Sequence, residues 1–120
     1  MRKIALLAAF LAVFSTASVA YAHPPYDIKI TFDPQTKVLT AMIMHNVSNP
    51  LNHYIKKVDV GLNGTEIIEH KISRQDNKDS QKVSYFIPDA KDGDVLSVEG
   101  YCSISGKLKK EITVKMVKGD

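Results

Sequence analysis

The chain has a single cysteine, Cys102, among its 120 residues. A disulfide within one chain is therefore excluded, although small exported domains usually pair their cysteines. A lone thiol has three roles open to it: a bridge to a second molecule, an inert buried side chain, or a metal ligand. Composition alone does not choose among the three.

The chain also lacks an apolar run long enough to cross a membrane. Residues 4–14 are continuously apolar, whereas a spanning helix needs roughly 20 such residues. Arg2 and Lys3 precede the run, and Ala20 with Ala22 forms the small-x-small pattern that signal peptidase accepts. We predict that residues 1–22 are a cleaved signal peptide and that the protein is periplasmic or secreted. An uncleaved membrane anchor is the less favoured alternative, and no cysteine lies near the cleavage point to carry a lipid anchor.

The predicted mature chain has no strong excess of positive or negative residues. Arg2 and Lys3 belong to the signal peptide, which leaves 14 of the 16 basic residues against 13 acidic ones. A nucleic-acid interface requires lysine and arginine clustered on one face of a domain. We therefore expect no nucleic-acid partner. The sequence predicts no particular oligomeric state.

Helical periodicity is absent from residues 23–120, where apolar and polar residues alternate instead. Ile28, Ile30 and Phe32, for example, are separated by single polar residues, which is typical of a half-buried strand. Seven such runs are predicted as strands, at residues 26–33, 37–45, 53–62, 65–73, 81–87, 95–103 and 108–117.

Turn residues separate these predicted strands. Asn63-Gly64 between two apolar runs is a strong hairpin signal, because both central residues of a type I′ turn need positive φ. The chain has neither internal repeats nor a low-complexity tract, so one domain is expected over residues 23–120. Seven short antiparallel strands in a domain of this size predict an all-β, immunoglobulin-like sandwich.

Two of the four histidines and Cys102 are expected to meet at one rim of such a sandwich. His45 ends the second predicted strand and His53 begins the third, so the connection brings both imidazoles together. Cys102 lies near the end of the sixth strand, which can neighbour the start of the third in a Greek-key arrangement. Two imidazoles and a thiolate suit iron, zinc or copper. His70 lies within an ordinary strand and is expected to be structural.

His23 becomes the first residue if the signal peptide is cleaved after Ala22. Its α-amine and its imidazole can then chelate one metal ion together, because an α-amine has a pKa near 8 and loses its proton easily. The alternative is a frayed chain end without a role. Pro24 and Pro25 follow directly and stiffen this start.

Three short motifs resemble one known family. The run HYIKKVDV that begins at His53, followed by a glycine-containing turn, resembles the His-Tyr-Ile strand of superoxide reductases, the ferrous domains of desulfoferrodoxin and neelaredoxin. The run YCSISG at residues 101–106 is similar to the family's Cys-Asn-x-His-Gly loop. His23-Pro24-Pro25 is similar to its His-x-Pro segment. The motifs occur in the family's order and span most of residues 23–117.

The resemblance implies a mononuclear, non-haem iron in a seven-strand sandwich. In the family, four equatorial histidines and an axial cysteine thiolate hold the iron, and an open position receives superoxide, which is reduced by one electron. Cys102 matches the axial ligand, and His53 and His23 match two of the histidines. In the family, a further histidine ligand usually lies six residues before the His-Tyr-Ile motif. His45 lies eight residues before His53, and it matches that ligand if the connection carries two extra residues. The resemblance thus implies metal ligation by His23, His45, His53 and Cys102, and an electron-donor protein as partner.

Two family residues are missing. Ser105 replaces the family's last histidine, and the lysine that attracts superoxide is absent because nothing precedes His23 after cleavage. Three interpretations follow: an exported desulfoferrodoxin-type protein with superoxide reductase activity, a non-catalytic periplasmic carrier of iron or copper, and an immunoglobulin-like interaction module without metal.

Overall fold

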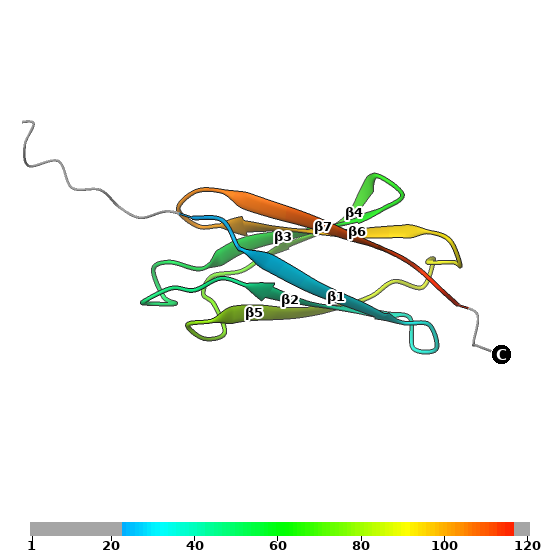
Figure 1. Cartoon of the computed structure of the whole chain (residues 1–120), viewed down its shortest axis with the longest axis horizontal. Coiled ribbons are helices and arrows are strands. Elements are labelled where there is room, and N and C mark those ends of the chain that lie inside the picture. Colours follow the sequence, from blue (N-terminus) through cyan, green and yellow to red (C-terminus); the bar gives the residue numbers. More distant parts are fainter. Residues whose placement is uncertain (1–22, 117–120) are drawn as a thin grey trace, which may run out of the picture.

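The computed structural model describes residues 23–116, which form seven β-strands and no helix (Figure 1). The strands are β1 (Asp27–Asp33), β2 (Val38–Met44), β3 (Ile55–Leu62), β4 (Thr65–Lys71), β5 (Ser80–Phe86), β6 (Val95–Cys102) and β7 (Lys107–Thr113). This confirms the predicted all-β fold and the number of strands. The predicted signal peptide, residues 1–22, lies outside the described residues.

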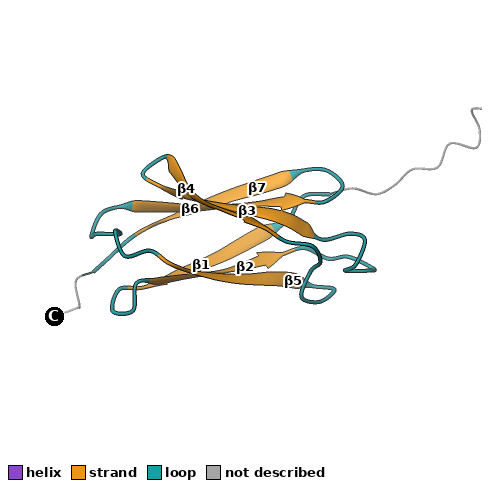
Figure 2. Ribbon diagram, turned by 180° about the vertical axis from the view of Figure 1, so that it is seen from behind, coloured by secondary structure: helices purple, strands orange, loops and turns teal. Residues whose placement is uncertain are grey.

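The strands form two antiparallel sheets that pack face to face (Figure 2). One sheet has the order β1-β2-β5 and the other has the order β4-β3-β6-β7. The chain changes sheet between β2 and β3, between β4 and β5, and between β5 and β6. The fold is thus the predicted immunoglobulin-like sandwich, in which β3 and β6 are hydrogen-bonded neighbours.

The core lies between the sheets and follows from the alternation in the sequence. Leu39, Ala41 and Ile43 of β2 share one hydrophobic core with Val58 and Val60 of β3, and all five side chains are fully buried. Burying a leucine, isoleucine or valine side chain stabilises a fold by about 1.5–3 kcal/mol. The same alternation carries the residue after β2, His45, into the buried layer.

The predicted hairpin turn is present between β3 and β4. Asn63 and Gly64 have φ angles of 51° and 87°, so both central residues are left-handed as a type I′ turn requires. The side-chain oxygen of Asn63 also accepts a hydrogen bond from the Val95 amide at 2.9 Å. The turn is therefore tied to the start of β6.

The last strand is shorter than predicted, because β7 ends at Thr113 rather than at residue 117. Beyond Thr113 the backbone bonds to a turn instead of a strand: the Val114 amide donates to Asp94 and the Gly93 amide donates to Val114. The Met116 amide donates to the Asp92 carboxylate at 2.9 Å. Residue 117 lies outside the described residues.

Three segments far apart in the sequence lie at one end of the sandwich (Figure 1). They are the stretch before β1, the β2–β3 connection and the β6–β7 turn. The first two segments carry the three predicted histidine ligands, and Cys102 is the last residue of β6, just before the third segment. Within residues 23–116, no helix has the length and apolar character needed to cross a membrane.

Candidate metal centre

His23, His45 and His53 form one cluster at this end of the sandwich. Their nearest ligand nitrogens all lie within 4.8 Å of one another, so the three side chains could hold a metal ion. The ring centroids are 4.8 Å apart for His23 and His45, and 4.9 Å apart for each of the other two pairs. His45 is fully buried, whereas His23 and His53 are half-buried. The cluster therefore has a closed inner side and an accessible outer side.

His45 is held by the strand before it and by the β4–β5 connection. It follows Met44, the last residue of β2, on the buried face. Its backbone amide donates to the carbonyl oxygen of Asp79 at 2.9 Å, and the Val47 amide donates to Lys78 at the same distance. These bonds fix the start of the β2–β3 connection against the β4–β5 connection.

His53 is placed by a tight turn that begins at Asn49. The amides of Asn52 and His53 both donate to the Asn49 carbonyl, at 3.2 and 3.0 Å. Just beyond His53, the Tyr54 amide donates to the Ser103 hydroxyl at 3.1 Å, and the Ser103 amide donates to the Tyr54 carbonyl at 2.7 Å. The backbone that follows His53 is thus anchored beside the end of β6.

His23 is held by the two prolines that follow it. The position that a Cβ on Gly106 would occupy lies 3.0 Å from three atoms of Pro24, and the corresponding position on Gly100 lies 3.7 Å from Pro25. The Tyr26 amide then donates to the Met44 carbonyl at 2.9 Å and opens the β1–β2 ladder. The structure places His23 against the sandwich, which favours a fixed position over a frayed chain end.

The hydrogen bonds around the three rings are incomplete. His45 Nδ1 lies 2.8 Å from Oε1 of Gln75, and its Nε2 lies 3.2 Å from the His23 carbonyl oxygen. Nε2 of His53 is buried and has no hydrogen-bond partner. An unpaired buried polar atom is costly and calls for an explanation such as a bound ion. Burial, followed by the nearby His45 and His23 rings, lowers the pKa of His53, which favours the neutral imidazole that ligates metals.

An open pocket of about 380 Å³ adjoins the outer side of the cluster. It is lined by His23, Asn46, Val47, Ser48 and His53. The lining carries no carboxylate, so a cation at this place would depend on the imidazoles for its ligands. A metal ion held by the three rings would remain within reach of solvent through this pocket.

Cys102 lies at the same end of the sandwich but is not a member of the cluster formed by the described residues. It pairs with Ile55 across the β3–β6 ladder and its side chain is 2% exposed. Its sulfur accepts a hydrogen bond from the Ile104 amide at 3.4 Å. The structure therefore brings together three of the four predicted ligands and leaves the cysteine outside their cluster as a buried free thiol.

The fourth histidine is structural, as predicted. His70 Nδ1 lies 2.8 Å from the Tyr85 hydroxyl, which joins β4 to β5 across the two sheets. Burial raises the pKa of Tyr85, so the phenol keeps its proton. His70 stands outside the histidine cluster of the described chain.

Gln75 is a site residue that the sequence did not reveal. It lies in the polar stretch between β4 and β5, and no spacing or motif in the sequence singles it out. In the structure Gln75 is buried, with 3% of its surface exposed. Beyond its contact with the His45 ring, its amide nitrogen donates to the carbonyl oxygens of His45 and Asn77, at 2.8 and 2.9 Å.

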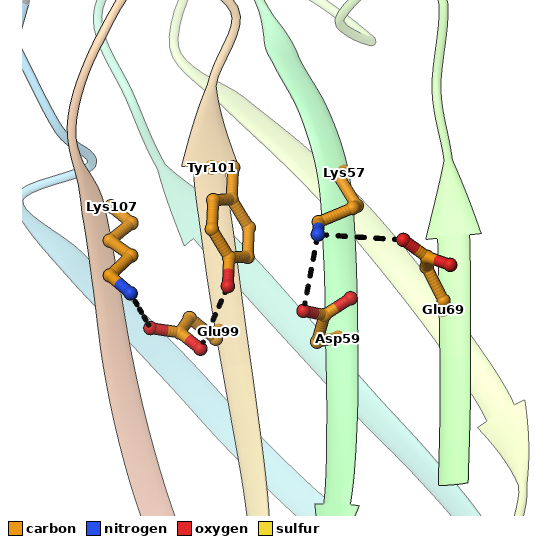
Figure 3. A network of polar contacts seen from close by, with 6 residues as sticks. All are labelled: Lys57, Asp59, Glu69, Glu99, Tyr101 and Lys107. Carbon is orange, nitrogen blue, oxygen red and sulfur yellow. Dashed lines mark hydrogen bonds and ion pairs between the residues drawn. The ribbon is translucent and has the colours of Figure 1, made fainter. Parts of the chain in front are cut away.

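A separate group of polar side chains covers the outer face of the four-stranded sheet (Figure 3). Its members are Lys57, Asp59, Glu69, Glu99, Tyr101 and Lys107. Lys57 pairs with Asp59 and Glu69, at 3.5 and 3.4 Å, and Tyr101 donates to Glu99 at 3.1 Å. Burial and the Glu99 contact raise the pKa of Tyr101 to about 12. The Lys57–Glu69 and Lys107–Glu99 pairs join neighbouring strands, and such pairs stabilise a sheet by about 0.2–1 kcal/mol each. We assign the group a structural role.

No protein-family model matches the chain, and no curated protein or solved structure shows significant similarity to it. The resemblance to superoxide reductases therefore rests on the three short motifs alone and stays a prediction.

Proposed function

We propose that the mature protein binds one first-row transition-metal ion outside the cytoplasm, through the imidazoles of His23, His45 and His53. The observation that carries this proposal is the meeting of three histidines, one from the stretch before β1 and two from the ends of the β2–β3 connection, with their ligand nitrogens within 4.8 Å. Imidazole is a favoured ligand of copper, iron, zinc and nickel.

The state of the individual nitrogens supports a metal ion rather than a hydrogen-bonded cluster. His53 Nε2 is buried without a partner, and His45 Nε2 faces a carbonyl oxygen. A cation at the centre of the cluster would give both nitrogens a partner. The lowered pKa of His53 reduces the competition between protons and the metal.

We place copper first among the metals. The cluster offers nitrogen donors only, and among divalent first-row ions Cu²⁺ binds such donors most strongly. Cleavage after Ala22 would add the α-amine of His23 as a fourth nitrogen. The buried inner side and accessible outer side of the cluster suit a carrier that takes up and releases its ion.

Iron with superoxide reductase-type redox activity is the second candidate, and Cys102 is the observation that favours it. The thiol is buried at the same end of the sandwich, and its sulfur accepts an amide hydrogen bond. Hydrogen bonds to sulfur are one means by which proteins tune a metal–thiolate bond. This candidate requires Cys102 to join the three imidazoles when the metal binds.

Elemental analysis of the protein, expressed with its own signal and purified without chelator, tests the proposal. We expect about one copper ion per chain, and a loss of that copper in His53→Gln. The matched control is His70→Gln, which removes a histidine outside the cluster and keeps the metal. One iron per chain that requires Cys102 would favour the second candidate. The absence of metal from the wild type would contradict both and leave the metal-free interaction module.

A further inference from the structure

Gln75 is a buried amide whose polar atoms are all bonded. Its backbone amide donates to the Pro50 carbonyl at 3.1 Å, which ties the β4–β5 connection to the β2–β3 connection. Its side-chain nitrogen donates to the carbonyl oxygens of His45 and Asn77. Each of the two amide hydrogens therefore has an acceptor, and the orientation of the amide group is settled by these two carbonyls.

The orientation of Gln75 decides which nitrogen of His45 carries the hydrogen. Since the amide nitrogen faces the two carbonyls, the amide oxygen faces His45 Nδ1 at 2.8 Å. An amide oxygen can only accept. Nδ1 of His45 is therefore the donor, and the lone pair of the neutral ring is on Nε2.

Nε2 of His45 then points at another acceptor, the carbonyl oxygen of His23, at 3.2 Å. Two acceptors at this separation repel each other unless a cation lies near them. The same nitrogen belongs to the ring that stands 4.8 and 4.9 Å from the other two imidazoles. Gln75 thus leaves the lone pair of this fully buried ring on the nitrogen that lies beside His23, another member of the cluster.

We infer that Gln75 is a positioning residue that makes His45 an Nε2 ligand before any metal arrives. This inference rests on the proposed function, because it concerns the same three histidines. Metal-bound histidines commonly donate their second ring nitrogen to an oxygen acceptor, which fixes the tautomer and the orientation of the ring. Gln75 supplies that acceptor.

A glutamine fits this position better than a carboxylate does. A carboxylate in its place would accept from His45 Nδ1 but would turn its other oxygen toward two carbonyl oxygens. The neutral amide instead holds the His45 ring and the backbone of the connection at the same time. The neutral amide also adds no negative charge to the site, so it does not offset the positive charge of a bound dication.

The test uses the full mature protein, labelled with nitrogen-15 in its histidines, at a pH well above the ordinary imidazole pKa of about 6.5. Nitrogen shifts report the tautomer of His45 without metal, and titration with Zn²⁺ alone reports affinity. The variants are Gln75→Met, which removes the acceptor, and Gln75→Glu, which keeps it. Gln81→Met is the matched control, because Gln81 is also buried but bonds to Asp76 and Lys82 rather than to a histidine.

We expect the Nδ1–H tautomer of His45 in the wild type, in Gln75→Glu and in Gln81→Met, and its loss in Gln75→Met. Zn²⁺ affinity should fall about 10–100-fold in Gln75→Met and stay within a factor of two or so of wild type in Gln81→Met. An Nε2–H tautomer in the wild type, or an unchanged tautomer and affinity in Gln75→Met, would overturn the inference. If Gln75→Met does not fold, the wild-type tautomer still decides it, because Nε2–H there would overturn the inference. A wild type that binds no Zn²⁺ but has the expected tautomers would contradict the proposed function instead.

Discussion

Pro24 lies directly against Gly106, whose missing side chain makes room for it. A Cβ at residue 106 would stand 3.0 Å from three atoms of Pro24, which is closer than real Cβ contacts normally come. Gly106 belongs to the β6–β7 turn, and Pro24 immediately follows His23. The close approach of a turn and a proline thus determines where the first predicted ligand lies.

Substitution of Gly106 by alanine should displace Pro24 and weaken metal binding. Gly106 has a φ of 93°, so the substitution also introduces backbone strain of about 1–2 kcal/mol. Gly93→Ala is the matched control, because Gly93 has a φ of 89° but no atom within 4 Å of its Cβ position. We expect both variants to lose unfolding free energy, measured by urea denaturation, and Gly106→Ala to lose more because its Cβ also meets Pro24. Metal affinity should fall only in Gly106→Ala, and equal affinities would show that Pro24 does not position His23.

Substitution of Cys102 by alanine should leave the copper content unchanged. The thiol is buried but lies outside the histidine cluster, so the variant loses a small core side chain and about 1 kcal/mol of stability. Elemental analysis and urea denaturation measure the two effects. Loss of the metal in this variant, with the fold intact by circular dichroism, would support the iron–thiolate candidate instead.

The metal-free protein should lose stability as the pH falls below neutrality. The pKa of His53 is lowered in the folded state, first by burial and then by His45 and His23, so the unfolded chain takes up a proton more readily. The stability is fully present above the ordinary imidazole pKa of 6.5 and is lost as the pH falls through the lower folded-state pKa. Urea denaturation across this range measures the effect, which should be smaller in His53→Gln. If the stability of His53→Gln depends on pH as strongly as that of the wild type, other groups cause the effect.

Acetylation of the α-amine of mature His23 should weaken Cu²⁺ binding while the three imidazoles remain. An acetylated amine is no longer a metal donor, whereas the ring contacts of Pro24 with Gly106 are unaffected. Isothermal titration with Cu²⁺ compares the acetylated and free forms. The same affinity in both forms would limit the site to imidazole ligands.

The fold was predictable from the sequence because it depends on local patterns. The alternation of β2 correctly places Leu39, Ala41 and Ile43 in the core and carries His45 into the buried layer. The turn at Asn63 and Gly64 requires a backbone conformation that few residues adopt. The end of β7 was predicted too late, because bonds to the turn at residues 92–94 replace the ladder there.

The candidate site was predictable only in part. His45 and His53 flank one connection in the sequence, so their meeting follows from the strand order. Gln75 and Gly106 contribute through contacts with residues distant in the chain, and no local pattern marks such contacts. Cys102 was predicted as a ligand but lies outside the histidine cluster. Its position depends on side-chain placement at the end of β6, which the alternation of apolar and polar residues alone does not determine.

A crystal of the copper-loaded mature protein, with anomalous diffraction recorded at the copper edge, tests the central claim most directly. The account predicts one anomalous peak, about 2 Å from a ring nitrogen of each of His23, His45 and His53. For His45 that nitrogen should be Nε2. A peak elsewhere on the surface, or no peak in protein loaded with one equivalent of copper, would contradict the claim that these histidines form a metal site.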